Sequence, residues 1–367
     1  MKKRITAILL ATALFVGAVV LTGCAKNENE ENGFVFELNE DAASYSVVEY
    51  KGNAETLNIP SIFKGLPVTE IKNAAVYGNT RLKKLIISEN IKTIGLSAFR
   101  DSTYLEEIVF PASLEEIKLE AFSGCISLKK ITVNEGNKVY SSKDGVLFAA
   151  NESELVLYPA RLEPTAADGE PKIYTVPQSV TKIRKGAFRD CKRVDKVVLP
   201  EGLIEIESYA FYNFTTLTGI DLKNVQTIGE YAFYNCTMLD EIVIPDSVQT
   251  VGEYAFANCM LASRIIIGKG LTEIAPYTFS SCKSANTINT GGNITKISRG
   301  AFNSCASAVR VLFPITLELI EEKAFSGCEQ LDFIYYKGTQ EQYVEIKVEK
   351  NNPALQNKDL TFEYEGG

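Results

Sequence analysis

The sequence predicts a repeat solenoid, mainly β with short helical turns and a cap at each end, built from stacked copies of one short unit. A phenylalanine recurs at a nearly constant interval, and the residue before it is alanine in every copy except Thr278. These phenylalanines are Phe99, Phe122, Phe188, Phe211, Phe233, Phe256, Phe279, Phe302 and Phe325, at successive spacings of 23, 66, 23, 22, 23, 23, 23 and 23 residues. Val76 occupies the same position in a degenerate first copy. Because so short a unit cannot bury its own apolar face, neighbouring copies must stack.

Each unit is predicted to contain two short extended segments. Apolar residues lie nine and usually eleven positions after each phenylalanine, as Ile242 and Ile244 do. A spacing of two is strand alternation, so positions nine and eleven should face inward and positions eight and ten outward. Proline often follows, here Pro245, and a second apolar pair comes next, here Val248 and Val251. One unit is therefore a strand, a corner, a second extended segment and a tight turn that carries the phenylalanine.

The 66-residue interval predicts one expanded coil at about residues 134–172. Counting back 23 residues from Phe188 reaches Thr165, so the phenylalanine of this coil is missing. The sequence around Asp144-Gly145 is typical of a hairpin, with apolar strand-like residues after the turn. An inserted structural hairpin is the favoured interpretation, and a functional loop is the alternative.

Residues 1–23 are predicted to be a lipoprotein signal peptide. A short basic start precedes sixteen mostly apolar residues, 5–20, a run better suited to secretion than to spanning a bilayer. The run ends in Leu-Thr-Gly-Cys24, which resembles the bacterial lipobox, so Cys24 is the expected site of lipid attachment. Residues 24–32 then read as the lipidated cysteine and a flexible acidic tether. The alternative is an ordinary signal peptide or membrane anchor with an incidental cysteine.

Residues 66–336 resemble the BspA-like leucine-rich repeats of bacterial surface proteins. That family uses a 23-residue unit close to AFxxCxxLxxIxIPxxLxxIxx. Several residues after Phe233 match it in register: Cys236, Leu239, Ile242, Ile244 and Pro245. The flanks also resemble the usual caps of the family, an N-terminal β cap at 33–65 and a C-terminal cap at 337–367.

Seven cysteines lie three residues after the recurring phenylalanine. They are Cys125, Cys191, Cys236, Cys259, Cys282, Cys305 and Cys328. Export would favour disulfides, but equivalent side chains in stacked strands run parallel, and their Cβ atoms are too far apart for relaxed bridges. We therefore expect buried free thiols that pack as small hydrophobes, with weak S–H bonds to turn carbonyls.

The composition argues against an enzyme. The chain has no histidine, which excludes Ser-His-Asp and Cys-His catalytic pairs and His-ligated metals. No nucleotide-binding or nucleophile motif is present, so the sequence predicts no catalytic, cofactor or metal site. Adjacent carboxylates such as Glu115-Glu116 could serve a glycosidase, but a solvated face is the favoured interpretation. The net charge of −8 argues against binding to nucleic acid.

Function is then expected on the outward positions of the strands. Apolar residues at position ten, beside a column that becomes basic and aromatic towards the C-terminus, predict a protein-binding strip. Its candidate residues are Val243, Arg264, Ile266, Arg310, Leu312 and Tyr335. The alternative is simple β-propensity on an exposed sheet.

We expect a monomeric cell-surface lipoprotein that acts as a non-enzymatic adhesion or interaction module, and the resemblance implies the kind of partner. Its membrane attachment would be the lipid on Cys24. Its partner would be a host matrix protein, a neighbouring cell or a surface polymer such as a glycan. The rival interpretation is a structural envelope component or spacer without a diffusible ligand.

Overall fold

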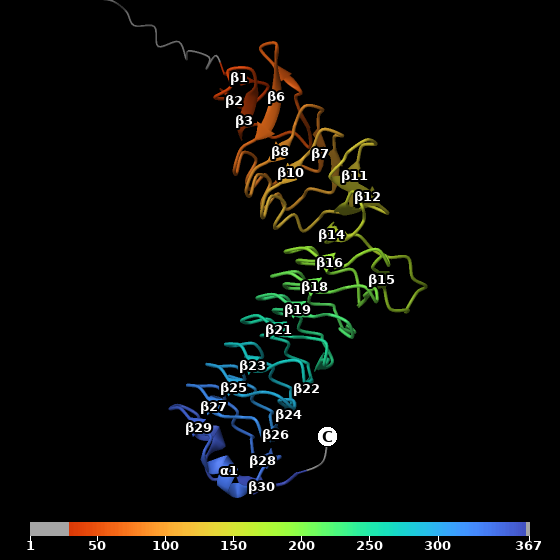
Figure 1. The fold of residues 1–367 in the computed structure, drawn as a ribbon. Coiled ribbons are helices and arrows are strands. Elements are labelled where there is room, and N and C mark those ends of the chain that lie inside the picture. Colours follow the sequence, from red (N-terminus) through yellow and green to blue (C-terminus); the bar gives the residue numbers. More distant parts are fainter. Residues whose placement is uncertain (1–28, 365–367) are drawn as a thin grey trace, which may run out of the picture.

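A computed structural model describes residues 29–364 as an elongated stack of coils that carries two parallel strand ladders (Figure 1). The predicted signal peptide and Cys24 lie outside the described residues. Among the described residues only α1 (Gln340–Val344) and the short 3₁₀ helix η1 (Pro353–Leu355) are helical. The fold is the predicted β solenoid.

The N-terminal cap is a set of antiparallel strands that leads into the stack. It contains β1 (Glu30–Glu31), β2 (Phe34–Leu38), β3 (Tyr45–Tyr50) and β5 (Ile62–Phe63). Residues 30 and 31 were expected to belong to the flexible tether, but β1 pairs antiparallel with β2, and Glu30 forms an ion pair with Lys51 at 3.2 Å. The folded part therefore begins before residue 33, because the tether's last residues supply an edge strand.

The first ladder is formed by the strands that follow each turn. Its pairs are parallel and in register, so equivalent residues of successive coils lie side by side, as in the pair Ile265↔Ile288. Its strands are β4 (Thr56–Ile59), β7 (Lys84–Ile87), β9 (Glu107–Phe110), β11 (Lys130–Val133), β15 (Ile173–Thr175), β17 (Lys196–Val198), β20 (Ile242–Ile244), β22 (Arg264–Ile267), β24 (Thr287–Asn289), β26 (Arg310–Phe313), β28 (Phe333–Tyr336) and β30 (Asp359–Thr361). The ladder starts at β4, inside the range 33–65 assigned to the cap, because β4 already pairs parallel with β7.

The second ladder contains the shorter extended segments. Its strands are β6 (Leu66–Ile71), β8 (Thr93–Ile94), β10 (Glu116–Ile117), β14 (Glu154–Leu157), β16 (Lys182–Ile183), β18 (Glu205–Ile206), β19 (Thr227–Ile228), β21 (Thr250–Val251), β23 (Glu273–Ile274), β25 (Lys296–Ile297), β27 (Leu319–Ile320) and β29 (Lys347–Val348). The C-terminal cap extends both ladders by one strand, since β29 pairs with β27 and β30 pairs with β28. A capping box at Thr339 starts α1, which lies between β28 and β29 in the chain.

The recurring phenylalanines form a buried column in the centre of the stack. Phe233 lies between Phe211 and Phe256, with ring centroids 4.8 and 4.9 Å apart. The turns that carry these rings are held by short-range hydrogen bonds such as Cys236 N to Phe233 O, but they do not continue into helices. The residues two before and two after the ring adopt positive φ, 54° at Tyr231 and 61° at Asn235, and this ends each helical turn.

The cysteines occupy the positions expected of packing residues. All seven between Cys125 and Cys328 are free and buried. Six of them place Sγ within 3.2–3.4 Å of the carbonyl oxygen of the phenylalanine in the preceding coil, as Cys259 does with Phe233. The expected thiol–carbonyl contacts are thus present, and the sulfur column accompanies the ring column.

The expanded coil contains the expected hairpin and divides the hydrophobic core. Strands β12 (Tyr140–Lys143) and β13 (Val146–Ala149) pair antiparallel around Asp144-Gly145, whose φ values of 51° and 83° fit the two-residue turn. Alternate residues of β13 join different cores: Leu147 packs with the N-terminal cluster, and Phe148 packs with the C-terminal one. In Figure 1 the coils up to β11 and those from β16 onward stand on either side of this hairpin and β14.

Candidate functional site

The predicted strip lies on one sheet, as its spacing required. Strands β20 to β28 are neighbours, and their register places Val243 beside Ile266 in one column. The basic residues Arg264 and Arg310 are two strands apart in the adjacent column, each opposite Thr287. The sheet therefore brings the candidate residues together on consecutive strands.

The side chains of the strip differ in exposure, and the prediction for Leu312 is wrong. Val243 is 41% exposed, whereas Leu312 is only 8% exposed and belongs to the buried set. Its register neighbours Asn289 and Tyr335 flank it on both sides, so the alternation rule does not make it accessible. Tyr335 is half-buried and packs against Tyr364, with ring centroids 4.7 Å apart.

Only one of the two basic side chains of the strip is free of an ion pair among the described residues. Arg264 forms a salt bridge of 2.5 Å with Glu241 on the preceding strand. Arg310 is exposed and has no ion pair among the described residues. Phe333, beside Arg310 in the register, is 39% exposed and adds an aromatic face. The accessible strip is therefore Val243, Arg264, Arg310 and Phe333, with Ile266 and Tyr335 half-buried within it.

A cavity of about 340 Å³ opens where the expanded coil interrupts the stack, and the sequence did not predict it. We call it the junction cleft. One lip is the turn at residues 118–126, and the opposite lip is the turn at 184–190. Phe122 and Tyr158 line its apolar wall. Leu119, on the first lip, is 55% exposed.

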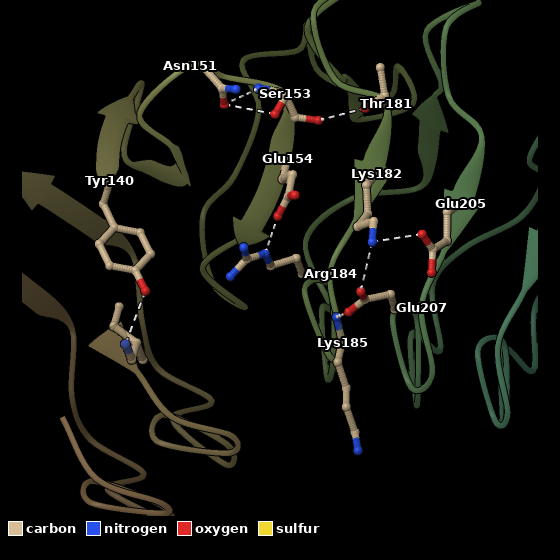
Figure 2. Close-up of polar contacts among 11 residues, drawn as sticks. Tyr140, Asn151, Ser153, Glu154, Thr181, Lys182, Arg184, Lys185, Glu205 and Glu207 are labelled. Carbon is tan, nitrogen blue, oxygen red and sulfur yellow. Dashed lines mark hydrogen bonds and ion pairs between the residues drawn. The ribbon is translucent and has the colours of Figure 1, made fainter. Parts of the chain in front are cut away.

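Ion pairs bind the strands beside the junction cleft to one another (Figure 2). Lys182 contacts Glu205 at 2.8 Å and Glu207 at 3.4 Å, and Arg184 pairs with Glu154 on β14. The hydrogen bond with Glu205 raises the pKa of Lys182, although burial opposes the shift. These contacts tie β14 to the C-terminal coils.

A single tyrosine crosses from the hairpin to the N-terminal coils. The Tyr140 hydroxyl accepts a hydrogen bond from the Ile117 N–H at 3.0 Å, as Figure 2 shows. In an uninterrupted stack the second ladder would continue from β10 to another parallel strand on the side facing away from β8. Burial raises the pKa of Tyr140, so the hydroxyl stays neutral and can accept this bond.

A second feature, a half-buried row of tyrosines also missed from the sequence, begins at the junction cleft. Tyr209, Tyr231, Tyr254 and Tyr277 stack in a row with centroid distances of 5.0, 4.8 and 4.8 Å. Arg189 lies over Tyr212 at 4.7 Å, beside the start of the row. The signal was available, because tyrosine stands two residues before the recurring phenylalanine in four consecutive copies.

Among residues 29–364, no group of three or more Cys, Asp or Glu side chains is placed to hold a metal ion. Of the adjacent carboxylates considered for glycosidase chemistry, Glu115 forms an ion pair with Lys92 at 3.0 Å. Over the same residues, no helix has the length and apolar character needed to cross a bilayer.

Comparisons with known proteins agree on the repeat type. The family model for the BspA type leucine rich repeat region matches residues 50–148, 171–267 and 215–332 in six copies. The matched ranges leave out residues 149–170, where β14 and the loop after it lie.

Solved structures share the fold at low identity. A leucine-rich repeat protein from Eubacterium ventriosum aligns with a TM-score of 0.53 and 19% identity over 91% of this chain and 95% of its own. The pneumococcal vaccine antigen PcpA aligns with a TM-score of 0.53 and 19% identity over 91% of this chain and 98% of its own. No curated protein sequence matches the chain significantly.

Proposed function

This chain belongs to the BspA-type leucine-rich-repeat family, and from that premise we propose that it is a non-enzymatic binding module on a bacterial cell surface. The observation that carries the proposal is the exposed strip on β20 to β28. There, apolar, basic and aromatic side chains lie in register on consecutive strands. Such a mixture is typical of protein-binding surfaces. A protein or a glycan of a host matrix, a neighbouring cell or a surface polymer is the proposed partner.

The proposed location rests on the N-terminal sequence. The basic start, the apolar run and the lipobox-like Leu-Thr-Gly-Cys24 occur in the order of a lipoprotein signal. Cleavage before Cys24 and lipidation of this residue would anchor the chain to the outer side of a membrane. We propose that the anchored chain is a monomer. The vaccine antigen among the structural relatives supports a surface role by analogy alone.

The test uses soluble residues 25–367 against immobilised matrix proteins, mucins and glycans. We expect saturable binding to one of them that is lost in the double variant Arg264→Glu/Arg310→Glu. The matched control is Arg81→Glu/Lys138→Glu, which reverses two exposed basic residues that have no ion pair among the described residues. Equal loss in both variants, or no effect of the strip variant, would contradict the assignment of the strip.

The rival function is a structural spacer of the envelope. The in-register stacking within each part of the two ladders favours it, because stacked coils hold their ends at a fixed separation. Binding to none of the surfaces, together with an envelope defect when the chain is deleted, would support the spacer instead.

A further inference from the structure

The backbone of the junction cleft carries a row of hydrogen-bond donors that the other turns use, apart from the last turn at Phe325, which meets the C-terminal cap. In the turn before it, the N–H groups of Ser97, Phe99 and Asp101 donate to carbonyls of the next coil at 3.2, 2.8 and 2.8 Å. The same three-bond pattern recurs at the turns of Phe188, Phe211, Phe233, Phe256, Phe279 and Phe302. The equivalent N–H groups of Glu120, Phe122 and Gly124 have no partner among the described residues.

The missing turn of the expanded coil explains this open row. The segment that should carry a phenylalanine near Thr165 is an exposed loop without strand or helix, so no carbonyls follow the turn of Phe122. On the opposite lip the acceptor positions that would serve a preceding turn are the carbonyls of Lys185, Ala187 and Arg189, and Ala187 O accepts from Tyr158 N at 2.8 Å. The carbonyls of Lys185 and Arg189 receive no donor among the described residues. Three donors thus face a partly open row of acceptors across the cavity.

The cavity also lacks the ring that would continue the aromatic column. Phe122 stacks on Phe99 at 5.4 Å on one side, and Tyr158 stacks on Phe188 at 5.0 Å from the other direction. No ring pair joins Phe122 to Tyr158, although both line the cavity. Phe122 is 7% exposed and Tyr158 is 1% exposed, so both rings lie beneath the surface of the cavity, and the exposed apolar side chain at its edge is Leu119.

The charges that remain unpaired around the junction cleft are basic. Lys118 on one lip and Lys185 on the other have no carboxylate within ion-pair distance among the described residues. Arg189, by contrast, forms an ion pair with Asp190 at 3.6 Å, although its buried Nε donates no hydrogen bond among the described residues. The carboxylates beside them, Glu154 and Glu207, are already engaged by Arg184 and Lys182.

We propose that the junction cleft binds an acidic peptide segment of a partner protein, which takes the place of the missing turn. Carbonyls at every second residue of the peptide accept hydrogen bonds from the N–H groups of Glu120, Phe122 and Gly124. Carbonyls of the following coil accept the equivalent bonds at the other turns. An aromatic or apolar side chain of the peptide packs on the apolar edge of the cavity at Leu119. A peptide carboxylate pairs with Lys118 or Lys185. The site is separate from the strip and does not depend on it.

The chain itself supplies a suitable probe. Residues 207–214 form the turn that follows the turn of Phe188, and the carbonyls of Ser208, Ala210 and Tyr212 accept its three N–H groups at 3.3, 2.7 and 2.9 Å. A fluorescein-labelled peptide of this sequence, Glu-Ser-Tyr-Ala-Phe-Tyr-Asn-Phe, is titrated with residues 25–367 and followed by fluorescence anisotropy. We expect saturable binding, weakened about thirtyfold when the peptide carries Phe211→Ala, because the anchoring ring is lost.

Two protein variants separate the junction cleft from the rest of the surface. Lys118→Glu/Lys185→Glu should weaken the peptide about tenfold or more, since the acidic peptide then meets like charge. Arg81→Glu/Lys138→Glu, with the same charge change elsewhere, should bind as the unmodified chain does. Arg264→Glu/Arg310→Glu should also leave the peptide unaffected, so failure of the strip and failure of the junction cleft give different results.

Hydrogen exchange identifies the contacts directly. On saturation with the peptide, the amides of Glu120, Phe122 and Gly124 should gain protection while those of Phe99 and Phe188 stay unchanged. No binding at about 1 mM peptide, a concentration that still detects complexes of only about −4 kcal/mol, would overturn the proposal. Binding that leaves the three amides unprotected, or full protection of them in the free chain, would overturn it as well.

Discussion

Removing one ring from the middle of the aromatic column tests how the stack is stabilised. Phe233 is fully buried and stacks on Phe211 and Phe256 at 4.8 and 4.9 Å. Truncating a buried phenylalanine costs about 3–5 kcal/mol, and the loss of two stacked pairs favours the upper part of that range. We therefore expect Phe233→Ala to lower the free energy of unfolding by about 4 kcal/mol. Urea unfolding followed by circular dichroism measures it, since the chain has no tryptophan.

The matched control is another phenylalanine outside the column. Phe333 on β28 is 39% exposed, so Phe333→Ala should cost less than about 1 kcal/mol. The reasoning is refuted if Phe233→Ala costs less than about 1 kcal/mol, or if the two variants lose the same stability. Either result would mean that the column is not the main support of neighbouring coils.

Three further predictions concern pH, the junction and the anchor. Burial raises the pKa of the Cys125 thiol to about 12. The folded chain therefore keeps a proton that the unfolded chain loses above about pH 9, and stability should fall from about pH 9 to 12 by about 1.4 kcal/mol per pH unit for this thiol. Urea midpoints at pH 8 and 10 measure this, and Cys125→Ala should show a smaller decline. Tyr140→Phe should cost about 1 kcal/mol and speed exchange of the Ile117 amide, because it removes the acceptor at 3.0 Å; unchanged exchange would contradict that contact. Cys24→Ser should move the chain from the membrane fraction to the soluble fraction on cell fractionation, and continued membrane retention would argue against a lipid anchor.

The repeat pattern was enough to predict the stack. The spacing of the phenylalanines placed the turns, and the apolar pairs placed both ladders, since each unit repeats the same local rules. Asp144-Gly145 likewise predicted the hairpin, because that dipeptide tolerates the two positive φ values that the turn requires. Local chemistry determines these features, so they are visible in the sequence.

The errors arose where distant segments meet. Leu312 follows the outward alternation, but its burial depends on side chains of neighbouring strands that lie 23 residues away in each direction. Glu30 was assigned to the tether because its surroundings are polar, yet β1 pairs with β2 and Glu30 with Lys51. Such contacts leave no periodic signal in the segment itself.

The sequence indicated the interruption that forms the junction cleft, but not the cleft itself. The missing phenylalanine near Thr165 indicated that one turn was absent, but not whether other residues filled its place. Tyr158 fills only part of it, by stacking on Phe188 and donating to Ala187 O. The donors of Glu120, Phe122 and Gly124 stay open because the rest of the coil runs into the exposed loop instead.

Residue-resolved hydrogen exchange of the free chain tests the interrupted stack most directly. The amides of Phe99, Phe188 and Phe233 should exchange slowly, because each donates to the next coil at 2.7–2.8 Å. The amides of Glu120, Phe122 and Gly124 should exchange much faster. Equal protection of the two groups would contradict an open donor row and the junction cleft built on it.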